Sequence, residues 1–252
     1  SKKTKAIVPM HYGGHMCDMS KILKIAKMYN LKIVEDAAQS FGASLNKKKN
    51  GNFFLAASFS MNPMKTLSGY GENGVVIINN KKIYLRLKRL RHAGTTSDPK
   101  KKITNYCVES SLNHKMDTIN ASLLLVSFKN FSKVLKKKND IANYYSKNLS
   151  SKVIKQEDYL HKHEKHGRYV YPIMVNKRDK MRNYLKKNGI ETKIFHLPLI
   201  NKSPFYRKYS KKFSTPNAEK LIKKIIILSL NEKLLEKQVI FTTNKINKLI
   251  KN

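Results

Sequence analysis

The sequence predicts an α/β fold in which a large first domain, residues 1–130, carries a mostly parallel sheet and residues 131–252 form a small α+β domain. A strand, a helix and a second strand follow one another over residues 6–10, 22–28 and 31–34, and two strands joined in this way are parallel. The second half instead mixes short strands with short helices. The chain has 252 residues, of which 40% are hydrophobic, enough for one large or two small domains.

The first strand, residues 6–10, is short and apolar, so we expect it to be buried. Asp18 or Ser20 is placed to cap the helix that follows. The next strand, residues 31–34, leads directly to Asp36. Residues 53–60 combine apolar and small side chains, which is typical of another buried strand ending at Ser60.

Three further elements complete the predicted first domain and lead out of it. Residues 74–78 are continuously apolar after a glycine and predict a core strand. Residues 81–92 have helical periodicity, and Gly94 ends that helix. A long helical stretch covers residues 116–148, with polar breaks near residues 136–139.

The second domain is predicted from alternation and capping. Residues 168–175 alternate as a strand, and a helix over residues 178–187 ends at Asn188-Gly189. Residues 192–195 form the next predicted strand. The stretch 221–230, followed by a last helix over residues 232–250, completes the domain.

Chemically distinctive side chains stand where strands end. Asp36 follows the second strand, Ser60 ends the next one, and Lys65 comes five residues later. Ligands of parallel sheets lie beyond the carboxyl ends of the strands. An aspartate, a serine and a lysine in this setting suit pyridoxal phosphate: the lysine forms a Schiff base with the aldehyde, the aspartate pairs with the pyridinium nitrogen, and the serine binds phosphate. The alternatives are a helix N-cap for Asp36 and a turn hydrogen bond for Ser60.

The run over residues 35–39, followed by Ser60 and Lys65, resembles the DegT/DnrJ/EryC1/StrS family. The resemblance covers nearly the whole chain. It implies a fold-type I pyridoxal phosphate (PLP) enzyme of the aspartate aminotransferase kind. Most members of the family are aminotransferases that act on nucleotide-linked keto sugars. It also implies that Gln39 contacts the 3-hydroxyl of the cofactor. Thr66 stands where the family often has an asparagine next to the lysine.

A second matching segment implies a homodimer. Asn113 occupies the position of a family asparagine that reaches the cofactor phosphate of the neighbouring subunit, although His114 and Lys115 replace the usual aromatic residue and arginine. Residues 194–199 and 227–231 resemble the family's C-terminal domain. A family segment before residue 6, carrying a phosphate-binding turn and a residue that stacks on the ring, has no counterpart among these 252 residues. The resemblance therefore implies an N-terminally incomplete large domain, and we expect these residues alone to be inactive.

We therefore expect a PLP-dependent aminotransferase that moves an amino group from an amino acid, in this family usually glutamate, to a keto sugar on a nucleoside diphosphate. Lys65 argues against the sugar dehydratases of the same family, in which histidine replaces this lysine. Two alternatives remain open: a non-catalytic remnant of such an enzyme, and a nucleic-acid-binding protein driven by charge.

Charge is the argument for that last alternative. The chain has 52 Lys and Arg against 16 Asp and Glu, a formal net charge of +36, and basic surfaces attract phosphate backbones. The basic residues are spread along the whole chain, and no zinc-finger spacing or aromatic RNA-binding motif accompanies them. We expect a nucleotide-sized partner rather than a nucleic acid.

The remaining sequence signals are weak. The histidines at 161, 163 and 166 lack a paired cysteine or carboxylate cluster, so no metal is expected. Cys17 and Cys107 stand in unrelated contexts, which favours free thiols in a reducing cytoplasm. No apolar run is long enough to span a membrane, and no signal peptide is visible.

Overall fold

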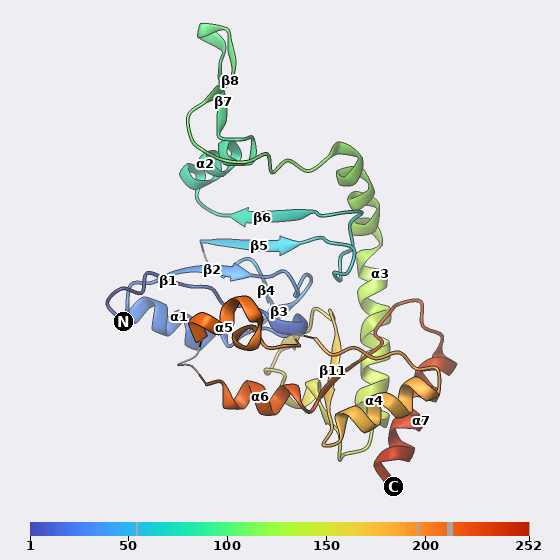
Figure 1. Cartoon of the computed structure of the whole chain (residues 1–252). Helices are drawn as coiled ribbons and strands as arrows, with labels where there is room; N and C mark the ends of the chain where they lie inside the picture. The colour runs from blue at the N-terminus through green and yellow to red at the C-terminus, as the bar shows by residue number, and fades with distance from the viewer. Residues whose placement is uncertain (54, 196, 211–213, 252) are drawn as a thin grey trace. The chain divides into compact units, whose positions relative to one another are not determined.

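A computed structural model describes residues 1–53, 55–195, 197–210 and 214–251 (Figure 1). They form two compact units, one of residues 1–132 with 161–167 and the other of residues 133–160 with 168–252. The assignment of domains 1–130 and 131–252 stays a prediction. No helix in the described ranges is both long and apolar enough to cross a membrane.

The first unit is built on a four-stranded sheet in the order β1-β2-β5-β6. The pairs β1–β2 and β2–β5 are parallel, whereas β5–β6 is antiparallel, as the arrows in Figure 1 show. The expected α/β architecture with a mostly parallel sheet is confirmed. Its strands are β1 (Ala6–Ile7), β2 (Lys32–Asp36), β5 (Ala56–Ser60) and β6 (Gly74–Ile78).

The connection from β1 to β2 contains a 3₁₀ turn, η1 (Tyr12–Gly14), and helix α1 (Met19–Met28). Of the two candidate caps, Asp18 is the one used: its carboxylate accepts the backbone N–H of Lys21 at 3.1 Å. A helix between two parallel strands is the unit that the sequence predicted.

Two of the predicted strands are less buried than expected. The first has only two residues in strand conformation, and Val8 beyond it is 64% exposed. Strand β6 has the predicted bounds, but it is the last strand of this sheet among the described residues, and Val76 is 56% exposed. The prediction of a core strand at residues 74–78 is therefore wrong for the described chain: residues on both faces of β6 are exposed, so neither face is covered as a core strand would be.

The main core of the first unit lies against one face of β5. Phe59 is buried there, and the ring of Phe41 meets it edge-on with 5.7 Å between centroids. Phe131 meets the other side of Phe41 at 4.9 Å. The buried members of this cluster are Ala37, Ala57, Phe59, Met61 and Leu67.

A smaller sheet in the order β10-β3-β4 covers a second cluster of Met16, Met19, Ala43 and Leu45. All of its strand pairs are antiparallel. It was not predicted, because each strand has only two residues. The strands are β3 (Ser44–Leu45), β4 (Lys48–Lys49) and β10 (Glu164–Lys165).

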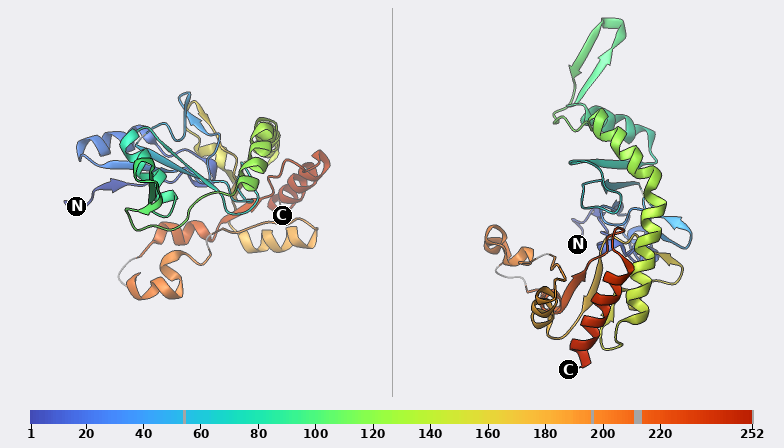
Figure 2. Two further views of the ribbon diagram at one scale, coloured as in Figure 1. Left: turned by 90° about the horizontal axis from the view of Figure 1, so that it is seen from above. Right: turned by 90° about the vertical axis from the view of Figure 1, so that its right-hand side faces the viewer.

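Beyond the sheet, α2 (Lys81–Arg91) confirms the helix predicted over residues 81–92. A thin hairpin of β7 (Thr95–Asp98) and β8 (Ile103–Cys107), joined by η2 (Pro99–Lys101), extends beyond it (Figures 1 and 2). Glu109 anchors the hairpin to α2 by ion pairs with Arg86 and Arg89. The hydrogen bonds from Arg86, and then from Arg89, hold the pKa of Glu109 below its ordinary value.

Helix α3 (Thr118–Asn148) runs without interruption, as the right-hand view of Figure 2 shows. The expected breaks near residues 136–139 are wrong. Polar side chains are tolerated there because they return to the helix backbone, as Asn139 does by donating to the carbonyl of Leu135 at 2.9 Å.

The second unit has an antiparallel sheet in the order β12-β11-β9. Tyr171, Ile173 and Ile226 of this sheet are almost fully buried, in a core that also includes Leu185 and Ile246. The strands are β9 (Ile154–Lys155), β11 (Tyr171–Met174) and β12 (Ile225–Leu228). The helices are η3 (Gln156–Tyr159), α4 (Arg178–Lys187), η4 (Ile200–Lys202), α5 (Pro204–Ser210), α6 (Pro216–Ile222) and α7 (Glu236–Lys251).

The predicted helix over residues 178–187 is confirmed with its bounds. A predicted strand over residues 192–195 is wrong: only an isolated bridge joins Lys193 to Ile227. Of the segment 194–199 that resembles the family, His196 lies outside the described residues. Helices α5 and α6 and the four 3₁₀ turns were not predicted.

Candidate functional site

The candidate site begins with two adjacent acidic residues that point to opposite faces of β2. Successive side chains of a strand alternate between faces. Glu35 is fully buried, whereas Asp36 is half-buried. One residue thus belongs to the interior, and the next is available to a ligand.

Asp36 shares its face of the sheet with two serines of β5. Asp36 is the direct neighbour of Ser58 in the parallel ladder, and Ser60 lies two residues further along the same face. Strand spacing and rise place the Cα atoms of Asp36 and Ser60 roughly 8 Å apart. Ser60 in turn pairs with Gly74, which has no side chain to cover it. A carboxylate and two hydroxyls therefore line one open face at the carboxyl end of the parallel strands.

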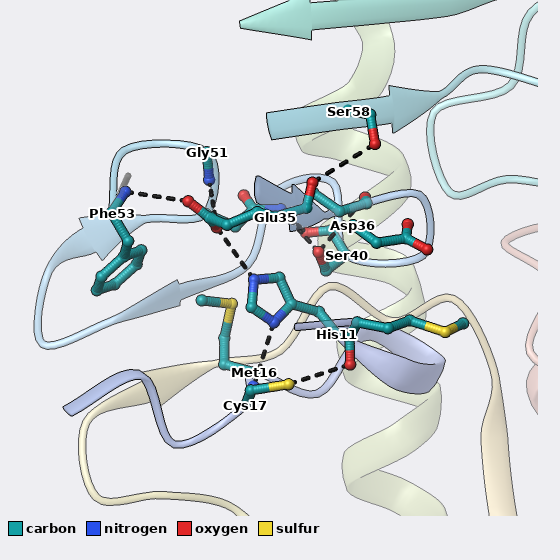
Figure 3. A network of polar contacts seen from close by, with 12 residues as sticks. His11, Met16, Cys17, Glu35, Asp36, Ser40, Gly51, Phe53 and Ser58 are labelled. Atoms are coloured by element: carbon teal, nitrogen blue, oxygen red, sulfur yellow. Dashed lines mark hydrogen bonds and ion pairs between the residues drawn. The ribbon is translucent and has the colours of Figure 1, made fainter. Parts of the chain in front are cut away.

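The opposite side of β2 is held by a buried polar network (Figure 3). The carboxylate of Glu35 accepts hydrogen bonds from His11 Nε2 at 3.1 Å, from the N–H of Gly51 at 2.9 Å and from the N–H of Phe53 at 3.1 Å. The N–H of Cys17 donates to His11 Nδ1 at 3.2 Å, so the ring proton is on Nε2 and points at Glu35. This network fixes the strand end that presents Asp36.

Sequence reasoning missed this network. Glu35 entered only as part of the run over residues 35–39, and no role was predicted for His11. A signal existed: a strand residue flanked by Val34 and Asp36 must face away from both of them. The partners of Glu35 could not be named, because two of its three donors are backbone groups of a distant turn.

Asp36 is held by backbone contacts on both sides. Its N–H donates to the carbonyl of Pro9 at 2.9 Å, and its own carbonyl accepts the N–H of His11 at 3.2 Å. Its Oδ1 accepts the N–H of Ala38 at 3.1 Å. A turn follows and no helix begins there, so Asp36 is not a helix cap. Oδ2 makes no hydrogen bond within the described ranges and is available to a ligand.

Gln39 is buried, and its Oε1 accepts the N–H of Gly13 at 2.7 Å. This bond fixes the orientation of the amide, since an N–H must face the oxygen. The amide nitrogen of Gln39 donates to no group in the part of the chain that the structure describes. It is left for an external acceptor.

Lys65 lies in a tight loop between β5 and β6. Its N–H donates to the carbonyl of Asn62 at 2.9 Å, and its carbonyl accepts the hydroxyl of Ser68 at 2.9 Å. Gly69 is required in this loop, because a Cβ there would lie 2.6 Å from the carbonyl oxygen of Met61. The loop therefore fixes the backbone of the half-buried Lys65 just beyond the serines.

Two polar atoms of this loop lack a partner. Thr66 Oγ1 and Asn73 Oδ1 are buried and make no hydrogen bond with any described group. The hydroxyl of Ser60 is also weakly engaged, since the N–H of Asn62 reaches it only at 3.5 Å. Buried polar groups are normally hydrogen-bonded. The hydroxyls of Thr66 and Ser60 are donors that fit the phosphate of the implied cofactor, whereas the amide oxygen of Asn73 can only accept and does not.

Asn113 stands apart from these residues. It forms an isolated bridge with His92, and its Oδ1 accepts the N–H of Lys115 at 3.2 Å. No hydrogen bond among the described residues joins it to Asp36, Gln39 or Ser60. The structure therefore brings Asp36 and Ser60 together and places Lys65 in the adjoining loop, whereas the role of Asn113 toward a second subunit stays a prediction.

Sequence comparison finds relatives that match nearly the whole chain. A 33% identical protein of Methanocaldococcus jannaschii, itself uncharacterised, matches 99% of this chain and 68% of its own length. The GDP-perosamine synthase of Escherichia coli O157:H7 is 31% identical over 98% of this chain and 66% of its own length. The chain thus spans about two thirds of these relatives.

Solved structures share the fold. An aminotransferase of this family from Brucella abortus superimposes with a TM-score of 0.88 at 25% identity, covering 97% of this chain and 64% of that one. DesV of S. venezuelae, solved with a ketimine intermediate, superimposes with a TM-score of 0.91 at 24% identity. The match covers 100% of this chain and 67% of DesV. The family model matches residues 1–247, so the chain belongs to the DegT/DnrJ/EryC1/StrS aminotransferase family.

Proposed function

We propose that this chain carries the cofactor-binding and catalytic residues of a PLP-dependent aminotransferase acting on a nucleotide-linked keto sugar. The observation that carries the proposal is the shared open face of Asp36 and Ser60, with Lys65 in the loop that follows. The GDP-perosamine synthase supports the substrate class, as does the dTDP-3-amino-3,6-dideoxy-alpha-D-galactopyranose transaminase of Aneurinibacillus thermoaerophilus, 28% identical. A putative sugar aminotransferase of Streptococcus pneumoniae with the same fold has been solved in both its PLP and its PMP form.

Bound PLP would supply an electron sink that makes the proton on the amine-bearing carbon acidic. Asp36 Oδ2 would keep the pyridine nitrogen protonated, because a carboxylate stabilises the adjacent positive charge. The hydroxyl of Ser60 would donate to a phosphate oxygen, whereas the hydroxyl of Ser58 already donates to the carbonyl of Glu35 at 3.4 Å. Gln39 would donate its amide N–H to the ring hydroxyl.

Lys65 would hold the cofactor between turnovers through Nζ and act as base and then acid for the proton transfer. The tight loop around Gly69 limits how far its backbone moves, which keeps Nζ positioned for both steps. We infer glutamate as the amino donor and a homodimer as the active unit, with Asn113 serving the partner's phosphate. The net charge of +36 suits a diphosphate-bearing substrate.

Covalent fixation tests the central residue. Purified protein is incubated with PLP, reduced with borohydride, digested and mapped by mass spectrometry. We expect the label on the peptide containing Lys65, absent in Lys65→Arg and retained in Lys82→Arg, a control at an exposed helix position. A label that persists at another lysine in Lys65→Arg would contradict the assignment.

The substrate class has its own assay. Amino acids are screened in the half-reaction of the full-length protein, by following loss of visible absorbance, and nucleotide-linked keto sugars are then screened for its reversal. Glutamate is expected to be the most efficient donor. Fixation at Lys65 without any half-reaction would favour a non-catalytic relative, whereas salt-sensitive retention on DNA without PLP binding would favour a nucleic-acid-binding protein.

A further inference from the structure

A second cluster of ligating side chains lies outside the residues assigned above. His15 follows the η1 turn, whereas His161 and Glu164 lie almost 150 residues later, in the segment that returns to the first unit. One ligand atom from each of the three residues lies within 4.8 Å of the other two. The rings of His15 and His161 stack with 5.0 Å between centroids. Neither the sheet core nor the candidate cofactor site requires this arrangement.

Glu164 is the centre of the cluster. Its side chain is fully buried, and its carboxylate receives His15 Nδ1 at 2.9 Å, the N–H of Met16 at 2.8 Å and the N–H of His161 at 3.1 Å. The bond from His161 comes from its backbone, and the ring Nε2 of His161 donates to the carbonyl of Met16 at 3.1 Å, which leaves the lone pair of its Nδ1 for an ion. His15 is 28% exposed on its side chain, which leaves an approach for a small ion.

The spacing is compatible with a tetrahedral metal centre. Ligand atoms about 2.0–2.2 Å from zinc lie roughly 3.3 Å from one another. His15 Nδ1 and the Glu164 carboxylate lie 2.9 Å apart, somewhat closer than this, and all three ligand atoms lie within 4.8 Å of one another, so modest side-chain rotation would complete the geometry. Two imidazoles and one carboxylate form a donor set that selects zinc-like ions over magnesium or calcium, which prefer oxygen ligands alone.

We propose that His15, His161 and Glu164 bind one divalent transition metal ion of the zinc class, with water in the fourth position. The ion would tie the segment of residues 161–167 to the η1 loop. That loop already accepts the N–H of Gly167 at the carbonyl of Gly14, at 2.8 Å, and it holds Gln39 through Gly13. The site is therefore structural and supports one wall of the cofactor site.

The test is zinc binding to untagged protein stripped with EDTA, measured by calorimetry and by thermal unfolding. We expect one saturable site per chain and a zinc-dependent rise in Tm. His15→Ala and Glu164→Gln should each weaken zinc binding by at least about tenfold. His163→Asn is the matched control: this exposed neighbour has φ +62°, which asparagine tolerates, and its variant should bind like the parent.

Cobalt supplies a second readout. Four-coordinate Co²⁺ at this site should give visible absorption that zinc abolishes. If His15→Ala fails to fold, Glu164→Gln decides, because its amide oxygen can still accept the N–H of Met16. Absence of saturable zinc binding, or equal binding by both variants and the parent, would show that the cluster is a hydrogen-bonded clasp without a metal.

Discussion

Replacing Glu35 with glutamine tests whether the buried network supports the strand that carries Asp36. Oε2 accepts two donors and Oε1 accepts one. In the amide, one of these positions becomes an NH₂ that faces an N–H, so at least one bond becomes a donor–donor contact. The other bonds lose their charge assistance. Breaking a buried, charge-assisted network from one side costs about 3–5 kcal/mol.

For a protein of this size each kcal/mol lowers Tm by about 2–4 °C. Even the lower estimate of about 3 kcal/mol predicts a fall of roughly 6–12 °C. Thermal unfolding followed by circular dichroism measures it. Glu72→Gln is the control, since this exposed carboxylate has one partner, Asn62, which an amide oxygen can keep. A Tm for Glu35→Gln within 2 °C of the Tm of Glu72→Gln would correspond to a destabilisation of only roughly half a kcal/mol and would refute the reasoning.

Four further outcomes are expected. Asp36→Asn should retain the Tm and covalent fixation but slow the glutamate half-reaction roughly 10- to 100-fold, the equivalent of about 1.5–3 kcal/mol; an unchanged rate would assign Asp36 to its turn alone. Gly94→Ala should destabilise the hairpin strongly in hydrogen exchange, because a Cβ there meets the carbonyl oxygen of Glu109 at 1.6 Å, whereas Gly189→Ala, with nearly the same φ and open space, should cost only about 1 kcal/mol. The depressed pKa of Glu109 means that its ion pairs are intact above the ordinary value of 4.5 and are lost as pH falls through the lower folded pKa; amides of residues 103–109 should lose protection in that window, and protection independent of pH would oppose this. Asn113→Ala should weaken PLP binding in a dimer observed by light scattering, and an active monomer would exclude the cross-subunit role.

The parts of the fold that follow local rules were predictable. The helix over residues 178–187 is marked by its periodicity and by the Asn188-Gly189 ending. The parallel pairing of β1 with β2 follows from the strand–helix–strand order, and it places Asp36 at a ligand-binding edge. Ser60 reaches the same face because the strand period of two fixes it relative to the neighbour of Asp36.

The remaining features depend on contacts between distant segments. The exposure of β6 depends on which segments cover its two faces, and no pattern within residues 74–78 encodes that. No local pattern predicts the contact of Glu164 with His15, because it spans 149 residues. The predicted breaks in α3 failed because polar residues there bond to their own helix. The roles of Gln39 and Asn113 come from the family resemblance alone, whereas that of Lys65 comes first from its place after a strand end; all three stay predictions.

The alternation at the end of β2 has a consequence for how substitutions would sort in a mutational scan. One peptide bond joins Glu35, which the fold needs, to Asp36, which the proposed chemistry needs. Variants at position 35 should reduce the amount of soluble protein in the cell, and the activity per molecule of the surviving protein should change little. Variants at position 36 should leave the amount of soluble protein nearly unchanged and lower the activity per molecule. If abundance and specific activity are both measured for each variant, substitutions at position 35 should lower mainly abundance and those at position 36 mainly specific activity.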